Sequence, residues 1–354
     1  MLIRKSYIVA FLIALGITAL LTPLILRLSI RFGWYDQPDG ERKIHSRPIP
    51  RTGGIAIAAG FLTPLAGLLL YSNDFSGALQ SDSLRLGAFF GGALAILGLG
   101  IYDDVKGVGA WGKLSVQCLV GLGIWYSGLR VDSIAVLGTT IDLGVWSLPL
   151  TVLWIAAIIN ALNLIDGLDG LAAGVTVLAA GSLFAIAMLD GHDLLALFAI
   201  SLAGSACGFL FYNFSPALIF MGDSGSMTIG YAFATAALWS AAKRSTLLAL
   251  SLPVLALGLP IADTAFAFLR RAWQRKSPFQ SDRGHMHHRL LDSGMSDRQA
   301  VLALYAICLV LAVGSVYLRM TEDLSVGLAT VVIAIAVFVG VRALRSRQHR
   351  LRDR

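Results

Sequence analysis

The 354-residue chain is 56% hydrophobic and only 14% charged, and its mean hydropathy is +0.75. This composition excludes a soluble domain built around one core and predicts a membrane protein that crosses the bilayer many times. The net charge of +7 does not indicate a nucleic-acid partner, because the basic residues are spread over the segments between apolar runs.

Eleven apolar runs can form membrane spans, since a span needs about 20 helical residues. In chain order they are 7–26, 53–71, 86–102, 112–127, 146–162, 171–189, 194–211, 226–242, 247–269, 300–318 and 324–343. We therefore expect an all-α polytopic membrane protein, with residues 1–344 as one integral-membrane domain and 345–354 as a basic cytoplasmic tail. Alternating apolar and polar residues at 130–144 predict a small external β-hairpin.

The distribution of positive charge predicts the orientation. Most lysines and arginines lie between spans at 27–51 and 270–298, or after the last span at 342–354. Such residues are retained on the cytoplasmic side of a membrane. We expect the N-terminus outside, the C-terminus in the cytoplasm, and the unusual polar motifs on the cytoplasmic face of the membrane.

The first of these motifs precedes the second span and reads Arg42-Lys43-Ile44-His45-Ser46-Arg47-Pro48-Ile49-Pro50-Arg51-Thr52-Gly53-Gly54. Its prolines prevent an early helix start, its glycines allow a close approach of the backbone, and its cations could hold phosphates. An ordinary positively charged cytoplasmic loop explains the motif equally well.

The third span ends in two adjacent carboxylates, Asp103 and Asp104. Adjacent carboxylates repel each other, and acidic residues near hydrocarbon are costly without contributing to orientation. A functional role is favoured over an ordinary polar helix end.

A polar segment separates the fifth and sixth spans. Asn160, Asn163, Asp166 and Asp169 follow one another at intervals of three, so they share one face if the helix continues. The two glycines of this segment would instead permit an unwound turn whose backbone amides face a ligand. Ligand binding is favoured over a purely structural polar network.

Residues 211–226 lead into the eighth span and include Asn213, Phe220 and Asp223. Asp223 lies at the expected N-terminus of a helix rich in small residues, which is a suitable place for a carboxylate-held Mg²⁺ beside phosphate oxygens. Simple helix capping by Asp223 or Ser224 is the alternative.

Three histidines, His285, His287 and His288, lie in the longest cytoplasmic loop. An anion site fits them better than zinc, because the neighbouring Arg283 and Arg289 would repel a cation and can donate to phosphate. Within the ninth span, Asp263 is a further intramembrane acid without an assigned role.

The combined motifs resemble the polyprenyl-phosphate N-acetylhexosamine-1-phosphate transferases, in their WecA/TagO type rather than the MraY branch. The resemblance extends from Lys43 to His288 and includes the number of spans. It rests on Lys43-x-His45 with Pro48-x-Pro50 and Gly53-Gly54, Asp103-Asp104, Asn160-x-x-Asn163-x-x-Asp166-Gly-x-Asp169-Gly, Phe220-Met-Gly-Asp223-Ser-Gly-Ser and His285-x-His287-His288.

The resemblance implies transfer of an N-acetylhexosamine 1-phosphate, expected to be that of N-acetylglucosamine, from the UDP-sugar to undecaprenyl phosphate with release of UMP. Mg²⁺ is the implied cofactor, with Mn²⁺ as an alternative. The reaction would be the first membrane step of an envelope polysaccharide such as lipopolysaccharide or teichoic acid. Membrane lipids are further partners, and a homodimer is left open.

Roles for individual residues follow from the same resemblance. Asp223 would hold the metal, Asp103 and Asp104 would be catalytic beside the lipid phosphate, and Phe220 would stack on uracil. The other implied substrate-binding residues are Lys43, Asn163, Asp166 and Asp169 at the nucleotide, His285, His287 and His288 at phosphate and sugar, and also His45, Asn160, Asn213 and Arg283.

We expect the lipid phosphate to attack the β-phosphate directly, with Asp103 or Asp104 accepting a proton from it or orienting it. A two-step route through an aspartyl phosphosugar is the alternative.

A transporter of an anionic substrate is the rival function. It is considered because intramembrane acids are frequent in transporters. The gathering of polar groups on one face argues against it.

Overall fold

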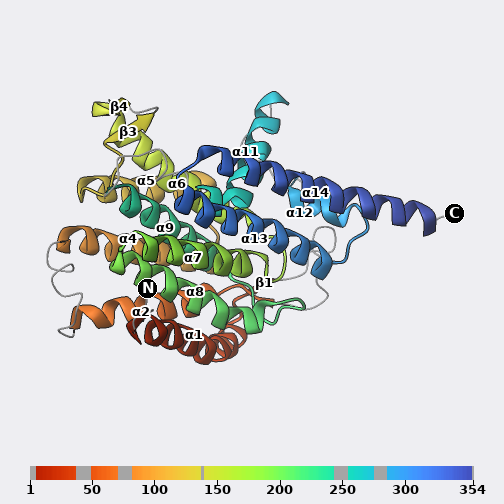
Figure 1. The fold of residues 1–354 in the computed structure, drawn as a ribbon. Helices are drawn as coiled ribbons and strands as arrows, with labels where there is room; N and C mark the ends of the chain where they lie inside the picture. Colours follow the sequence, from red (N-terminus) through yellow and green to blue (C-terminus); the bar gives the residue numbers. More distant parts are fainter. Residues whose placement is uncertain are drawn as a thin grey trace.

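The computed structural model describes residues 5–36, 49–70, 82–136, 139–242, 254–274 and 285–352 as a bundle of long helices with two short hairpins (Figure 1). The helices are α1 (Lys5–Phe32), α2 (Gly54–Leu70), α4 (Ser83–Lys106), α5 (Ala110–Tyr126), α6 (Ser147–Ile165), α7 (Leu171–Leu189), α8 (Asp193–Asn213), α9 (Gly222–Ala242), α11 (Gly258–Trp273), α12 (Met286–Leu291), α13 (Asp297–Thr321) and α14 (Leu324–Arg352). The all-α polytopic prediction is confirmed.

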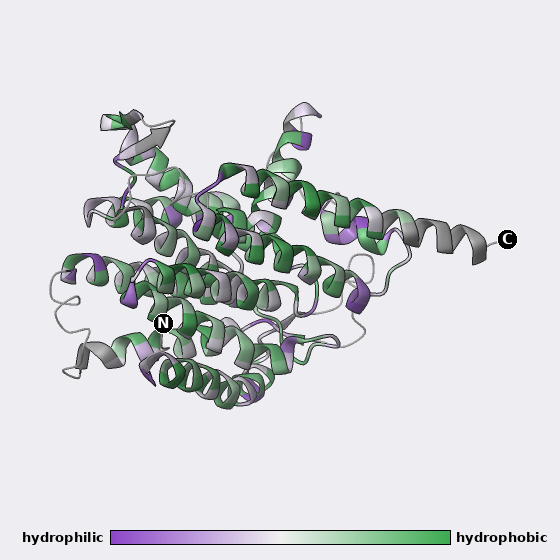
Figure 2. Ribbon diagram, in the orientation of Figure 1, coloured by the Kyte–Doolittle hydropathy of each residue, from purple (hydrophilic) through white to green (hydrophobic). Residues whose placement is uncertain are grey.

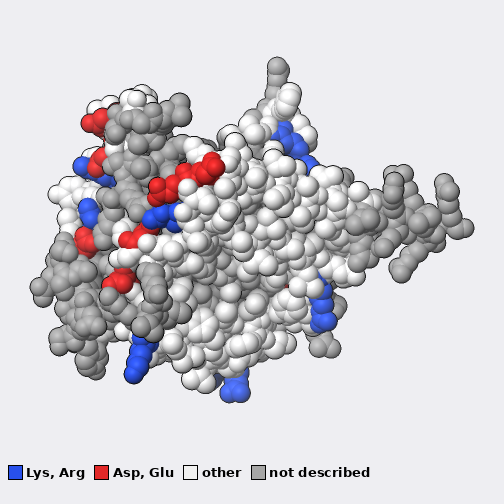
Figure 3. Space-filling view, in the orientation of Figure 1, with Lys and Arg blue, Asp and Glu red and all other residues white. Residues whose placement is uncertain are grey.

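Hydropathy supports a membrane location for the bundle. Among the described residues, seven helices are long and apolar enough to cross a membrane. Apolar residues cover the helices along their lengths (Figure 2), and the middle of the face in Figure 3 is largely uncharged, with acidic side chains gathered toward one end. The chain is a multi-pass membrane protein, while the count of eleven spans and their orientation remain predictions.

Both hairpins are antiparallel and very short. Strand β3 (Ser133–Val136) pairs with β4 (Thr139–Asp142), as the sequence predicts. Strand β1 (Tyr35–Asp36) pairs with β2 (Ile49–Pro50), which the sequence pattern does not indicate. The second pairing brings the end of α1 next to the segment that enters α2.

The ninth expected span, 247–269, is described from residue 254 onward. Residues 254–256 are helical, residue 257 forms a turn, and α11 then starts at Gly258 and carries Pro260 in its first turn, where proline is tolerated. In Figure 1 the far end of α11 projects away from the bundle, and its side chains Phe266, Leu269 and Trp273 are exposed.

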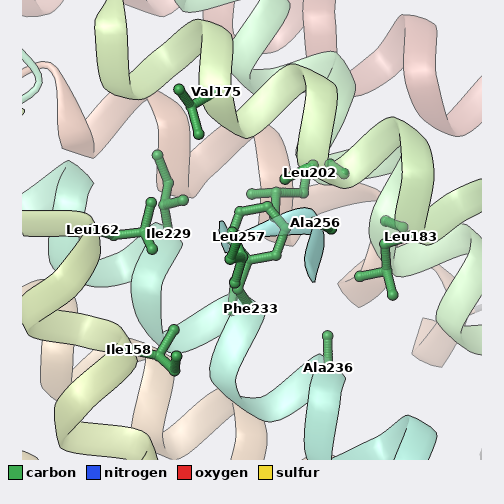
Figure 4. Close-up of a cluster of buried hydrophobic side chains, with 14 of the residues drawn as sticks. Ile158, Leu162, Val175, Leu183, Leu202, Ile229, Phe233, Ala236, Ala256 and Leu257 are labelled. Atoms are coloured by element: carbon green, nitrogen blue, oxygen red, sulfur yellow. The ribbon is translucent and has the colours of Figure 1, made fainter. Parts of the chain in front are cut away.

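The core lies where α6, α7, α8 and α9 meet (Figure 4). Leu162, Leu183, Leu202 and Phe233, one from each helix, are all buried there. Helix α9 runs antiparallel to α4 and α6, since its first turn contacts their C-terminal ends and its later turns contact their earlier residues. This antiparallel packing collects the C-terminal ends of α4 and α6 and the N-terminal end of α9 at one end of the bundle.

Candidate active site

Three carboxylates meet at that end of the bundle. Asp103 and Asp104 lie in the last turn of α4, and Asp223 lies in the first turn of α9. One oxygen from each lies within 4.8 Å of the others, and all three side chains are half-buried. Within the described part of the chain, this is the one group of three His, Cys, Asp or Glu side chains close enough to share a metal ion.

Asp104 holds α9 in place. Its two oxygens accept hydrogen bonds from the backbone N–H groups of Asp223, at 2.7 Å, and Ser224, at 3.1 Å. The first N–H groups of a helix have no partner within the helix, so a carboxylate from another helix satisfies them and also interacts favourably with the helix dipole. The carboxylate of Asp104 therefore fixes Asp223 relative to Asp103.

Glycines allow the backbones around these carboxylates to touch. Gly222 has a φ of +69°, and a Cβ there would overlap the carbonyl oxygen of Arg51 and lie 2.6 Å from the Asp104 carboxylate. A Cβ at Gly54 would likewise overlap the backbone of Gly225. Any side chain at these glycines would push the segment entering α2 away from α9.

Backbone hydrogen bonds join the same two segments. The N–H of Phe220 donates to the carbonyl of Pro50 at 2.8 Å, and the N–H groups of Gly53 and Gly54 donate to the carbonyls of Phe220 and Met221 at 3.0 and 2.9 Å. The close approach predicted for the Gly-Gly pair is thus made to the protein's own backbone. It places Phe220 and Arg51 at the rim of the carboxylate group.

Lys113 bridges two of the three carboxylates. Its Nζ lies 2.7 Å from Asp103 Oδ2 and also pairs with Asp223. Helix α5 starts at Ala110, only a few residues after α4 ends, so its first turn folds back beside Asp103. The backbone N–H of Val108 donates to Asp103 Oδ1 at 2.6 Å. No motif in the sequence indicated Lys113 as a site residue.

The polar segment between α6 and α7 is unwound, as its glycines allow. Helix α6 ends at Ile165, Gly170 has a φ of +79°, and α7 starts at Leu171. Asn163 remains helical and donates to Ser226 Oγ at 3.1 Å, three residues after Asp223 on α9. The segment therefore contributes directly to the wall beside Asp223.

Asp166 follows in the unwound turn. Burial, together with the nearby carboxylates of Asp223 and Asp104, raises the pKa of Asp166 to about 7, while Arg51 opposes the rise. Asp166 thus lies within electrostatic range of the three-carboxylate group. Its predicted contact with the nucleotide stays a prediction.

Three other predicted ligands make contacts that hold the surrounding chain. Asp169 accepts from the N–H of Ala217 at 2.9 Å. Asn213 accepts from the N–H of Gly170 at 3.1 Å and donates to the carbonyl of Ile219 at 3.0 Å. Asn160 donates to Gln117 Oε1 at 2.7 Å. Their substrate contacts remain predictions.

The histidine segment is anchored on two sides. Asp263 of α11 accepts from His285 Nδ1 and from the N–H of Met286, each at 2.8 Å, which gives this intramembrane acid a role. The ring of His287 packs on the unwound turn, since a Cβ at Gly167 would lie 2.8 Å from its Nε2. Burial, together with the neighbouring His288 and His285, lowers the pKa of His287 to about 4, while Asp263 opposes the decrease.

The ring of His287 thus lies against Gly167, the residue that follows Asp166, and the ring centroid of His288 lies 4.3 Å from that of His287. The predicted contacts of the histidines with phosphate and sugar stay predictions. Three predicted substrate-binding residues, Lys43, His45 and Arg283, lie outside the described residues.

Comparison with known proteins identifies relatives over most of the chain. Residues 86–241 match the model of glycosyl transferase family 4. A probable undecaprenyl-phosphate N-acetylglucosaminyl 1-phosphate transferase of Bacillus subtilis is 38% identical over 314 residues, covering 88% of this chain and 85% of the relative. A decaprenyl-phosphate N-acetylglucosaminephosphotransferase of Mycolicibacterium smegmatis is 35% identical, covering 92% and 84%. An undecaprenyl-phosphate alpha-N-acetylglucosaminyl 1-phosphate transferase of Thermotoga maritima is 32% identical, covering 77% and 78%.

Proposed function

The chain belongs to the polyprenyl-phosphate N-acetylhexosamine-1-phosphate transferases and is a phosphoglycosyltransferase, and we propose that it transfers N-acetylglucosamine 1-phosphate from UDP-N-acetylglucosamine to undecaprenyl phosphate, releasing UMP. The observation that carries the proposal is the meeting of Asp103, Asp104 and Asp223 with Lys113 at one end of the bundle. The names of the relatives support the polyprenyl-phosphate acceptor and the N-acetylglucosamine group.

The donor set suits Mg²⁺. Three carboxylates within 4.8 Å offer the oxygen ligands that this hard cation prefers, without sulfur or imidazole ligands that would favour zinc. When bound there by Asp223 with Asp103 or Asp104, Mg²⁺ would neutralise charge on the diphosphate and on the departing UMP.

The chain's own groups divide the remaining work. Both oxygens of Asp104 accept backbone N–H bonds, so this carboxylate is assigned to holding α9. Asp103, beside Lys113, is the better candidate to orient the lipid phosphate or accept its proton. An oxygen of the lipid phosphate then forms a bond to the β-phosphorus, and the bond from that phosphorus to the bridging oxygen breaks, with its electron pair leaving on UMP.

Lys113 supplies positive charge where two anionic substrates must approach each other. Its ammonium group already lies between two carboxylates, so it can exchange one of these contacts for a phosphate oxygen without a large movement. The histidine segment and Asp166 would face the donor from the other side of the site.

Direct attack is supported over the aspartyl phosphosugar route. Asp103 Oδ1 accepts from Val108 and Oδ2 pairs with Lys113. These donors make the carboxylate a weaker nucleophile toward phosphorus, whereas each oxygen keeps a second lone pair that can accept a proton. Incubation with radiolabelled UMP and unlabelled UDP-N-acetylglucosamine, but no lipid, tests this. Robust appearance of label in the UDP-sugar would establish the two-step route instead.

The overall reaction is tested with purified protein in detergent, radiolabelled UDP-N-acetylglucosamine, undecaprenyl phosphate and Mg²⁺. We expect a labelled lipid product and equimolar UMP, both dependent on lipid and metal and both lost in Asp223→Asn. A panel of other UDP-N-acetylhexosamines determines the sugar. Absence of lipid-linked product, together with UDP-sugar uptake into proteoliposomes, would favour the transporter hypothesis.

A further inference from the structure

A second polar layer lies one helical turn beneath the carboxylates. Gln117 of α5 is fully buried, and Asn160 of α6 donates to its Oε1 at 2.7 Å. The same amide of Asn160 donates to the carbonyl of Ala156 at 2.7 Å, one turn back in its own helix. Asn160 therefore uses its amide hydrogens within the protein.

The two layers belong to the same three helices. Gln117 lies four residues after Lys113 on α5, and Asn160 lies three residues before Asn163 on α6, so each lower residue is on the same face as an upper one. Gln117 also reaches α9, since its Nε2 lies 3.7 Å from the sulfur of Met227, the residue that follows Ser226 on that helix. Each helix thus contributes one residue to the site and one to the layer below.

Packing alone does not require this second layer. Helices α5 and α6 already approach closely, since a Cβ at Gly121 would lie 3.1 Å from Val152 Cα. Helices α6 and α9 do so as well, since a Cβ at Gly230 would lie 2.6 Å from Ile159 Cα. Small residues are the usual means of such contact in membranes, whereas buried amides are costly unless hydrogen-bonded.

We propose that Gln117 and Asn160 are positioning residues for the transfer reaction, which set the rotation and depth of α5 so that Lys113 lies between Asp103 and Asp223. The proposal rests on the function assigned to Lys113 above. A shift of α5 by one residue moves Lys113 by about 1.5 Å along the axis and rotates it by about 100°. Apolar contacts tolerate small shifts, but a 2.7 Å hydrogen bond between the buried amide of Gln117 and the half-buried amide of Asn160 does not.

Gln117→Leu tests the proposal in the purified enzyme. A misplacement of roughly 1 Å can reduce a rate about 100-fold, so we expect kcat to fall roughly 10- to 100-fold while the KM for UDP-N-acetylglucosamine stays within about 3-fold. The matched control is Tyr231→Phe, which removes a buried hydroxyl that donates to the carbonyl of Phe89 at 3.0 Å and joins α9 to α4. The control should lower the thermal midpoint but leave kcat within about 2-fold.

An exchange of the two amides separates positioning from stability. Gln117→Asn shortens one partner and Asn160→Gln lengthens the other, so each single variant should lose roughly 10-fold in kcat and the double variant should recover most of the loss. The Lys113→Arg variant gives a second test. Relative to the kcat of Lys113→Arg itself, adding Gln117→Leu should decrease kcat far less than the same change does in the wild type, because Gln117 acts through Lys113.

Three results would overturn the proposal: unchanged kcat in Gln117→Leu, equal fold losses in the wild-type and Lys113→Arg backgrounds, or no recovery in the exchanged pair despite a wild-type thermal midpoint. An inactive wild-type enzyme in the same assay would instead count against the proposed function.

Discussion

Lys113→Met should separate the two roles that its ammonium group can have. The group pairs with Asp103 and Asp223, whose oxygens lie within 4.8 Å of each other. Without it, two unit charges 4.8 Å apart repel by roughly 3.5 kcal/mol at an effective dielectric constant of about 20. The side chains are 13% to 25% exposed, so water screens part of this repulsion.

If Lys113 stabilises the transition state by a similar amount, about 3 kcal/mol, its replacement should decrease kcat roughly 100-fold. The measurement is the initial rate of lipid-linked product formation at saturating substrates. Arg85→Met is the matched control, because Arg85 pairs with Asp82 at 3.1 Å at the opposite end of α4. Its kcat should equal that of the wild type.

Lys113→Met should also change the response of the thermal midpoint to Mg²⁺. In EDTA, Lys113→Met should unfold at a lower temperature than the wild type, since Asp103 and Asp223 then repel each other. Added Mg²⁺ should raise its thermal midpoint more than that of the wild type, because the metal relieves a repulsion that Lys113 otherwise relieves. A variant with wild-type kcat and an unchanged response to Mg²⁺ would refute the reasoning.

Other variants test the remaining assignments. Asp223→Asn should nearly abolish turnover while circular dichroism and the thermal midpoint stay close to wild type; a wild-type rate would remove Asp223 from the metal site. Asp103→Ala should reduce kcat more than affinity for UDP-N-acetylglucosamine, measured by calorimetry, and equal losses would indicate a structural role. Gly167→Ala should raise the KM for the UDP-sugar, because its Cβ would lie 2.8 Å from His287 Nε2; an unchanged KM would show that the histidine segment does not contact the donor. Acid should destabilise the fold through His287, because the pKa of this side chain is lowered to about 4 in the folded protein. As the pH falls from about 6.5, His287 is protonated first in the unfolded chain, so the free energy of unfolding should decrease by up to roughly 3 kcal/mol by pH 4. His287→Asn should flatten the decline of the thermal midpoint over this range, and an unaltered slope would contradict the assignment.

The sequence predicted the helices well because hydropathy is a local property. Each expected span coincides with a helix over its described residues, apart from single residues at some ends and a turn at residue 257 within 247–269. The segment from Asn160 to Gly170 was ambiguous because its polar residues have helical spacing while its glycines favour a turn. Tertiary contacts decide between these, since Gly170 donates its N–H to Asn213, 43 residues later in the chain.

The candidate site was predicted only in part. Asp103 and Asp104 stood out because carboxylates at the end of an apolar run are costly. Asp223 stood out because it lies at the expected N-terminus of a helix rich in small residues. Lys113 did not, since a lysine at the cytoplasmic end of a span is expected from orientation alone. Its pairing with Asp223, 110 residues away, is a property of helix packing that periodicity cannot supply. Its inclusion within the apolar run 112–127 was the available signal.

The location of the site at helix ends has a physical cause. Within a span every backbone N–H is bonded inside its own helix, so the middle of the bundle has few donors to offer a ligand. The first turn of α9 has unpaired N–H groups, and Asp104 takes two of them. A fixed carboxylate group therefore forms most readily where α4 ends and α9 begins. The phosphate of a polyprenyl lipid also lies at the membrane surface, at the depth of helix ends. The requirement for free backbone donors and the position of the acceptor phosphate thus favour the same end of the bundle.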